Sequence, residues 1–184
     1  MKLALLTSEP EYIESIARTE NLALVISNIP SAKIKFICAS LNIPLKVIPH
    51  QSFINRIAHD SAIKSELDKI SPDLIMAAGY NRLIVSQELL EQYKNKLINL
   101  HLSYLPDFPG AFPHEEAFNS KAKISGFTFH LIDKGIDTGR ILFQQKINIS
   151  DCKSKEEVKN RLRNASLDAL HEFLKLEISS VINN

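Results

Sequence analysis

Nine residues decide the fold: Ile98-Asn99-Leu100-His101-Leu102-Ser103-Tyr104-Leu105-Pro106. Apolar and polar residues alternate through the first six of them, as is typical of a β-strand with two different faces. Asn99, His101 and Ser103 then share one face. A polar group left without a partner in an apolar environment costs roughly 1–3 kcal/mol, so these side chains are expected to meet a ligand. The stretch predicts one wall of an active site.

Short apolar runs alternate with helical patterns on the N-terminal side of this strand. Strands are expected at residues 3–7, 22–27, 45–48, 74–78 and 97–103, and helices at 12–18, 32–41, within 52–70 and near 87–93. Such alternation predicts an α/β protein with a doubly wound, mostly parallel, Rossmann-like sheet and helices on both faces. Ligands of such sheets bind at the carboxyl ends of the strands, which is where the polar face of residues 97–103 ends.

The rest of the chain adds two strands and one long helix. The strands are expected at residues 126–132 and 141–149, which gives a sheet of about seven strands. An amphipathic helix is expected from about residue 155 to residue 182. Its predicted buried stripe consists of Val158, Leu162, Ala165, Leu170, Phe173 and Leu174.

Length and composition limit the protein to a few classes. A chain of 184 residues fits one domain, expected to span residues 1–184. The 22 Lys and Arg residues nearly balance the 21 Asp and Glu residues, which disfavours nucleic acid and anionic membranes as partners. Cys38 and Cys152 show no disulfide or zinc spacing. The N-terminal apolar run is too short for a signal peptide, and no run reaches membrane-spanning length, so a cytoplasmic location is expected.

Four motifs together carry a resemblance to a known family. They are Asn99-Leu100-His101-Leu102-Ser103-Tyr104-Leu105-Pro106, Phe108-Pro109-Gly110, Gly126-Phe127-Thr128-Phe129-His130 and Gly135-Ile136-Asp137-Thr138-Gly139. In order and spacing they closely resemble the signature of the 10-formyltetrahydrofolate-dependent formyltransferases. The nearest branch looks like the small single-domain enzymes of purine biosynthesis, whose acceptor is glycinamide ribonucleotide.

The resemblance implies roles for particular residues. Asn99, His101 and Asp137 match the catalytic trio of the family. The co-substrate 10-formyltetrahydrofolate would lie against Arg56, Asn81, Arg82, Leu83 and Ile84, and against the backbone of Asp133, Lys134, Gly135 and Ile136. No metal is implied, and the remaining histidines, His50, His59, His114 and His171, show no metal-ligand spacing.

The residue types suit formyl transfer on chemical grounds. When an amine attacks a formamide-like carbonyl, a tetrahedral oxyanion forms, and a preorganised hydrogen-bond donor stabilises it. Asn99 and His101, two residues apart on one face, are both expected to reach that oxygen. A carboxylate beside the imidazole raises the histidine pKa. Asp137 is expected to be that carboxylate, or to hold the water that relays the proton of the amine.

Several of these residues have an ordinary structural alternative. His101 alone would suit a hydrogen-bonded core position, and Asp137 alone would suit a turn. Ser103 is as well suited to capping the following loop as to touching a ligand. His130 lies in a matching strand and faces either the same cavity or the core. His114 occupies a position of the family motif and is a candidate for supporting the site without contacting the ligand.

The chain departs from the family on the acceptor side. The family binds its substrate phosphate with a loop rich in Gly, Ser and Asn after the first strand, whereas this chain has Thr7-Ser8-Glu9-Pro10-Glu11-Tyr12. Proline removes an amide donor, and two acids place negative charge where a phosphate would bind. In the C-terminal helix, Asn164-Ala165-Ser166 replaces an acidic position. Residues expected on the acceptor side are Ser8, Glu9, Ser103, Gly110 and Arg140.

These observations predict a cytoplasmic formyltransferase that acts on a small primary amine and is a monomer or homodimer. Glycinamide ribonucleotide is the acceptor that the resemblance implies, with an amino sugar or an amino-acid-derived amine as the alternative. Methionyl-tRNA is disfavoured because the resembling transferases carry a further C-terminal domain. Two other classes remain open: a hydrolase that deformylates 10-formyltetrahydrofolate, whose resembling members carry an extra N-terminal domain, and a silent folate-binding protein.

Overall fold

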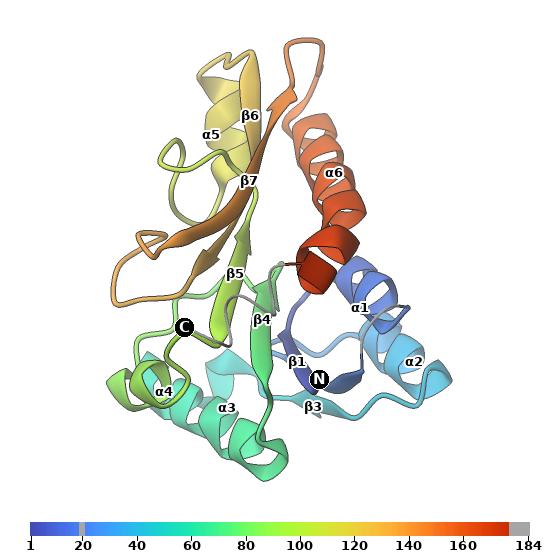
Figure 1. Cartoon of the computed structure of the whole chain (residues 1–184), viewed down its shortest axis with the longest axis vertical. Coiled ribbons are helices and arrows are strands. Elements are labelled where there is room, and N and C mark those ends of the chain that lie inside the picture. Colours follow the sequence, from blue (N-terminus) through green and yellow to red (C-terminus); the bar gives the residue numbers. More distant parts are fainter. Residues whose placement is uncertain (19–20, 177–184) are drawn as a thin grey trace. The chain divides into compact units, whose positions relative to one another are not determined.

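The computed structural model describes residues 1–18 and 21–176 of the chain. The chain forms two compact units, of which one spans Met1–Ile98 and the other begins at Asn99. The boundary falls inside a β-strand, so each unit contains part of the same strand. Figure 1 shows the elements of both units, coloured along the sequence.

The first unit is built from alternating strands and helices. Its strands are β1 (Leu3–Leu6), β2 (Leu22–Ser27), β3 (Leu45–Val47) and β4 (Leu74–Ala78). Its helices are α1 (Pro10–Ala17), α2 (Ala32–Ser40), α3 (Arg56–Ile70) and α4 (Gln87–Gln92), with a short 3₁₀ turn, η1, at His50–Ser52. β1 pairs in parallel with both β2 and β4, and β2 pairs in parallel with β3.

The central strands β1 and β4 of this unit are buried because helices cover both faces of the sheet. Every residue of β1 and of β4 is buried, as expected for a parallel sheet. Figure 1 shows α1 and α2 on one side of these strands and α3 and α4 on the other. Ser31, Asn55 and Ser86 cap α2, α3 and α4, and each side-chain oxygen accepts a hydrogen bond from a backbone N–H in the first turn.

The second unit combines two antiparallel strands with two helices. Its elements after the shared strand β5 (Leu97–His101) are α5 (Pro113–Asn119), β6 (Ile124–Leu131), β7 (Ile141–Asn148) and α6 (Lys155–Leu176). β6 and β7 pair in antiparallel fashion. The Phe129 ring of β6 stacks on the Phe173 ring of α6 at 4.1 Å between centroids. A second cluster packs Val158 and Leu162 of α6 against Ala117 of α5.

The seven strands follow the order β3-β2-β1-β4-β5-β6-β7. The mostly parallel seven-stranded α/β fold and the long C-terminal helix expected from the sequence are therefore confirmed. Most expected bounds agree with the observed ones to within two residues, and α3 lies inside the expected range 52–70.

Three expectations need correction. β5 ends at His101, two residues before the expected end, because residues 102–112 turn away into a loop. α5 was not expected, although Pro113 at its first position and two acids in its first turn are usual start signals. On α6, Ala165 is only half-buried and Ser166 is buried in its place. The expected end of this helix, Ile182, lies outside the described residues.

The close pairing of β6 and β7 leaves no room for a side chain at residue 126. A Cβ on Gly126 would lie 2.1 Å from the Gln145 carbonyl oxygen of the facing strand. We expect Gly126→Ala to lower the free energy of unfolding by roughly 1–3 kcal/mol, the usual cost of overpacking, as measured by urea denaturation.

The neighbouring substitution Ser125→Ala is the matched control. The Ser125 hydroxyl oxygen is buried without a hydrogen-bond partner, so its removal should leave stability equal or higher. If Gly126→Ala were as stable as Ser125→Ala, β6 and β7 would be less tightly paired than described.

Candidate active site

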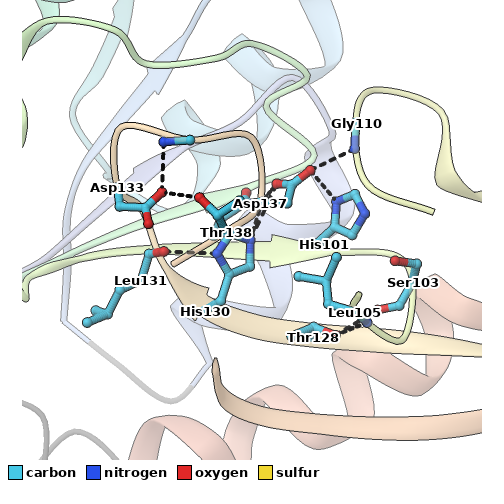
Figure 2. A network of polar contacts seen from close by, with 12 residues as sticks. His101, Ser103, Leu105, Gly110, Thr128, His130, Leu131, Asp133, Asp137 and Thr138 are labelled. Carbon is cyan, nitrogen blue, oxygen red and sulfur yellow. Dashed lines mark hydrogen bonds and ion pairs between the residues drawn. The ribbon is translucent and has the colours of Figure 1, made fainter. Parts of the chain in front are cut away.

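The Asp137 carboxylate lies at the centre of a buried polar cluster in the second unit (Figure 2). Its Oδ1 accepts a hydrogen bond from Asn99 Nδ2 at 3.4 Å and lies 3.5 Å from His130 Nε2. Its Oδ2 accepts a hydrogen bond from the Gly110 backbone N–H at 2.8 Å and lies 3.5 Å from His101 Nδ1. The structure thus brings together Asn99, His101 and Asp137, which the sequence had placed in one trio.

The turn between β6 and β7 presents this carboxylate. Asp137 has a φ of +54°, a left-handed conformation that aspartate tolerates better than most residues. The Asp133 carboxylate supports the turn by accepting hydrogen bonds from Gly135 N at 2.9 Å and from Thr138 Oγ1 at 2.8 Å. At the end of the turn, a Cβ on Gly139 would lie 1.8 Å from the Leu131 carbonyl oxygen. Only glycine fits so close an approach.

The loop after β5 is held by a second polar network. Thr128 Oγ1 donates to the Ser103 carbonyl oxygen at 2.7 Å and accepts from Leu105 N at 3.1 Å. The buried Ser103 hydroxyl donates to the Asp107 carbonyl oxygen at 2.5 Å. Ser103 therefore does not share the polar strand face expected from the sequence, and its hydroxyl is used within the loop. This loop carries the Phe108 carbonyl and the Gly110 N–H to the cluster.

The contacts of His101 define its tautomer. Its Nε2 lies 2.8 Å from the Phe108 carbonyl oxygen, which can only accept, so Nε2 carries the hydrogen. Nδ1 faces Asp137. Burial lowers the pKa of His101 by more than the Asp137 charge and the Phe108 carbonyl raise it. Asp137 raises the pKa of His101, as expected, but burial lowers it by more. His101 is therefore mainly a neutral Nε2–H donor at neutral pH.

Asp137 itself is ionised. Burial acts to raise the pKa of this carboxyl, but the hydrogen bond to His130, the nearby His101 and the Gly110 N–H together outweigh burial and hold the pKa below its usual value. The cluster therefore contains a carboxylate beside a neutral imidazole.

His130 orients the Asn99 amide. Its Nδ1 lies 2.9 Å from the Leu131 carbonyl oxygen, so Nδ1 carries a hydrogen. The His130 Nε2 atom lies 3.1 Å from Asn99 Nδ2 and 3.5 Å from Asp137 Oδ1, so this ring nitrogen contacts both the amide and the carboxylate. The sequence alone did not decide whether His130 faces the cavity or the core. The signal that could have decided it is the pair Thr128 and His130, two polar residues on one face of β6.

The expected folate residues lie in both units. In the first unit, Arg56 begins α3 and is exposed, while residues 81–84 follow β4 without regular structure. Asn81 is exposed but Ile84 is buried in the core. Asp60 of α3 was not singled out from the sequence, yet it holds this segment, because its carboxylate accepts hydrogen bonds from Val85 N and Ser86 N at 2.7 and 2.9 Å.

In the second unit, the turn after β6 contains the other expected folate residues. Lys134 and Ile136 are exposed, Asp133 supports the turn, and Gly135 is half-buried. Arg140 on the acceptor side is exposed as well, and His114 is half-buried on α5. The Gly110 N–H, also expected on the acceptor side, is bonded to Asp137.

Within residues 1–18 and 21–176, no three or more His, Cys, Asp or Glu side chains are grouped so as to hold a metal ion. None of the helices in this part of the chain is both long enough and apolar enough to span a membrane.

Comparisons with known proteins agree with this architecture. The family described as formyl transferase matches residues 11–174. Phosphoribosylglycinamide formyltransferase of Bacillus subtilis is 36% identical over 140 residues, covering 76% of this chain and 71% of the relative. Formyltetrahydrofolate deformylase of Haemophilus influenzae is 31% identical over 157 residues, covering 85% of this chain. The chain spans only 55% of that deformylase.

A solved structure extends the likeness to three dimensions. The crystal structure of phosphoribosylglycinamide formyltransferase from Streptococcus pneumoniae matches with a TM-score of 0.87 at 26% identity. The match covers 95% of this chain and 96% of the other chain.

The contact between Asp137 and His101 predicts a measurable pKa change. Asp137→Asn keeps the shape of the side chain but removes a negative charge that raises the pKa of His101. We expect this pKa, already below its usual value in the wild type, to fall further in the variant, as followed by NMR titration of the imidazole.

The control is Asp107→Asn, which removes an exposed carboxylate from the loop after β5. It should leave the His101 titration unchanged. A His101 pKa that is equal or higher in Asp137→Asn would mean that the carboxylate does not act on this imidazole.

Proposed function

The chain belongs to the formyl transferase family, and we propose that it transfers a formyl group from 10-formyltetrahydrofolate to a primary amine. The observation that carries this proposal is the convergence of Asn99, His101 and Asp137 in one buried cluster. A neutral donor and an ionised acceptor lie side by side there, which is what acyl transfer to an amine requires.

The donors of the cluster suit the oxyanion of the reaction. The amine nitrogen attacks the formyl carbon, a C–N bond forms, and the carbonyl oxygen becomes negative. His101 Nε2–H now donates to Phe108 and would turn its hydrogen bond toward that oxygen. The Asn99 amide nitrogen lies 3.1 Å from His130 Nε2 and 3.4 Å from Asp137 Oδ1, and an N–H group that turns away from the longer of these two contacts would also reach that oxygen.

The carboxylate of the cluster suits the proton transfers. The attacking nitrogen becomes cationic and must lose a proton before the intermediate collapses. Asp137, ionised because its pKa is lowered, accepts that proton directly or through a water. Collapse breaks the bond between the formyl carbon and the folate nitrogen, which leaves with a proton. His101 and Asp137 are the titratable groups that deliver it.

Residues outside the cluster are proposed to bind the two substrates. Folate would contact Arg56, the segment 81–84 and the backbone of residues 133–136, where Lys134 and Ile136 are exposed. The acceptor would contact the side that includes Ser8, Glu9, Ser103, Gly110 and Arg140. As the name of the Bacillus subtilis relative indicates for that protein, glycinamide ribonucleotide is the reference acceptor. We place the activity in the cytoplasm, in a single-domain protein that is a monomer or homodimer.

Deformylation is the second candidate function. It is favoured by the 31% identity to the Haemophilus influenzae deformylase. The same donors would stabilise the oxyanion, and a water would replace the amine as nucleophile. A silent folate-binding protein is less well supported, because Asn99, His101 and Asp137 are all present and in contact.

Release of tetrahydrofolate separates these functions. We expect release from 10-formyltetrahydrofolate to require an added primary amine, because the amine is the nucleophile in the proposed reaction. The measurement is the rate of release with and without a panel of amines that includes glycinamide ribonucleotide. Release at the same rate without any amine would identify a deformylase, and no release at all would identify a silent binder.

Substitutions in the cluster test the roles of the donors. His101→Ala and Asn99→Ala should each reduce turnover by roughly 10²–10³-fold, the usual loss for one oxyanion donor. Binding of 10-formyltetrahydrofolate, measured by fluorescence titration, should change far less. Asn119→Ala, at an exposed position of α5, is the control and should behave as the wild type. Turnover within a few-fold of wild type in His101→Ala would remove His101 from the mechanism.

A further inference from the structure

Two side chains of β7 contact the loop after β5. The pairing of β6 with β7 places Gln144 opposite Thr128 and Lys146 opposite Gly126. Alternate residues of a strand share a face, so these two pairs are neighbours on one face of the β6–β7 hairpin. The loop packs on that face. A Cβ on Gly126 would lie 3.1 Å from Tyr104 Cβ, and Lys146 Nζ lies 4.9 Å from the centroid of the Tyr104 ring.

The Gln144 amide joins this loop to β6. Its Nε2 donates to the Leu105 carbonyl oxygen at 3.0 Å and to Thr128 Oγ1 at 3.3 Å, which uses both hydrogens of the amide. Thr128 Oγ1 also accepts from Leu105 N and donates to the Ser103 carbonyl oxygen (Figure 2). One donated and two accepted hydrogen bonds are all that a hydroxyl can make. Gln144 thus completes the network, and a fully satisfied buried network is rigid.

The next residues of the loop form a closed turn. The Ser103 hydroxyl donates to the Asp107 carbonyl oxygen at 2.5 Å, and Asp107 N donates to the Tyr104 carbonyl oxygen at 3.1 Å. The two ends of residues 103–107 are therefore connected directly. Because Gln144 and Thr128 hold Leu105 in the middle of this turn, they also determine where the chain leaves it at Asp107.

The chain that leaves the turn supplies two backbone groups to the candidate active site. The Phe108 carbonyl oxygen lies 2.8 Å from His101 Nε2, and the Gly110 N–H donates to Asp137 Oδ2 at 2.8 Å. Phe108 and Gly110 both have a positive φ, of +53° and +102°. Phenylalanine rarely adopts this conformation, so contacts on either side must hold the backbone there.

We propose that Gln144 is a positioning residue for the proposed formyl transfer. By fixing the loop after β5 on the hairpin, it sets the Phe108 carbonyl and the Gly110 N–H in place at the cluster. A residue that served only to pair β7 with β6 would contact β6 alone, whereas the Gln144 amide reaches beyond the hairpin to Leu105. The catalytic consequence of this inference rests on the proposed function, and the structural consequence does not.

The substitution Gln144→Met tests the proposal because it keeps the length of the side chain and removes both N–H groups. A small displacement of the loop weakens its hydrogen bonds steeply. The Gly110 N–H lowers the pKa of Asp137, so this pKa should rise in the variant, as followed by NMR of ¹³C-labelled carboxyl groups. The rise should be partial, because His130 and His101 still face the carboxylate from β6 and β5.

His101 should respond in the opposite direction. The Phe108 carbonyl raises the pKa of His101, so this pKa should fall in Gln144→Met. Simple exposure of the cluster to water would have the reverse effect on both groups, because burial raises the pKa of Asp137 and lowers that of His101. The pair of titrations therefore distinguishes a displaced loop from a loosened fold. Reversed shifts would overturn the proposal.

Gln145→Met is the matched control. Gln145 has the same side chain, is exposed, and faces Phe127 across the hairpin instead of Thr128. Both titrations should match the wild type in this variant. If Gln144→Met gave the same two pKa values as Gln145→Met, Gln144 would not position the loop and the proposal would fall.

Substitutions of Thr128 provide an independent arm that decides the matter if Gln144→Met does not fold. Thr128→Ser retains the hydroxyl that joins Gln144 to the loop, while Thr128→Val keeps the shape of the side chain without it. We expect the pKa shifts of Gln144→Met to recur in Thr128→Val and to be absent in Thr128→Ser. Equal titrations in the two Thr128 variants would contradict the role of this network.

Kinetics test the catalytic consequence. We expect kcat to be reduced about tenfold or more in Gln144→Met, since small displacements of reacting groups can cost up to roughly 10²-fold. KM for 10-formyltetrahydrofolate should change less than about 3-fold. An unchanged kcat together with shifted pKa values would overturn the positioning role in catalysis. If the wild type transferred no formyl group, the proposed function would fail, while the two titrations would still test whether Gln144 holds the loop.

Discussion

A buried carboxylate needs partners, and the second unit is arranged to supply them to Asp137. Two imidazoles, one side-chain amide and one backbone N–H surround its two oxygens within 3.5 Å. These partners come from β5, β6 and the loop after β5. An ionised carboxyl without them would be costly to bury. The same contacts that keep Asp137 charged also orient Asn99 and set His101 opposite Phe108, so stability of the site and its chemistry depend on one charge.

The backbone around this charge is fixed by close approaches that allow few residue types. Gly126 and Gly139 lie where a Cβ would overlap a facing carbonyl oxygen, and Asp137 adopts a left-handed conformation. Thr128 connects the loop after β5 to β6 through two hydrogen bonds. This arrangement positions the Phe108 carbonyl and the Gly110 N–H without regular secondary structure. The motifs on which the family resemblance rests thus include positions where the backbone geometry is restrictive.

Much of the fold could be predicted from periodicity, because strands of a covered parallel sheet and amphipathic helices leave clear patterns. Asn99 and His101 were also accessible, because they alternate on one strand, whereas Asp137 was assigned to the same trio through the family resemblance. The end of β5 was not, because Ser103 continues the alternation although its hydroxyl bonds within a loop. The balance between burial and the Asp137 charge at His101 was equally inaccessible, since burial depends on tertiary packing.

The charge state of Asp137 tests the central claim most directly. Selective ¹³C labelling of aspartate carboxyl carbons would allow the titration of Asp137 to be followed by NMR as the pH is lowered. A carboxylate held by His130, His101 and the Gly110 N–H should remain ionised below the ordinary aspartate pKa of about 3.9. A titration midpoint at or above that ordinary value would show that burial outweighs these contacts, and that the cluster does not hold a carboxylate ready to accept a proton.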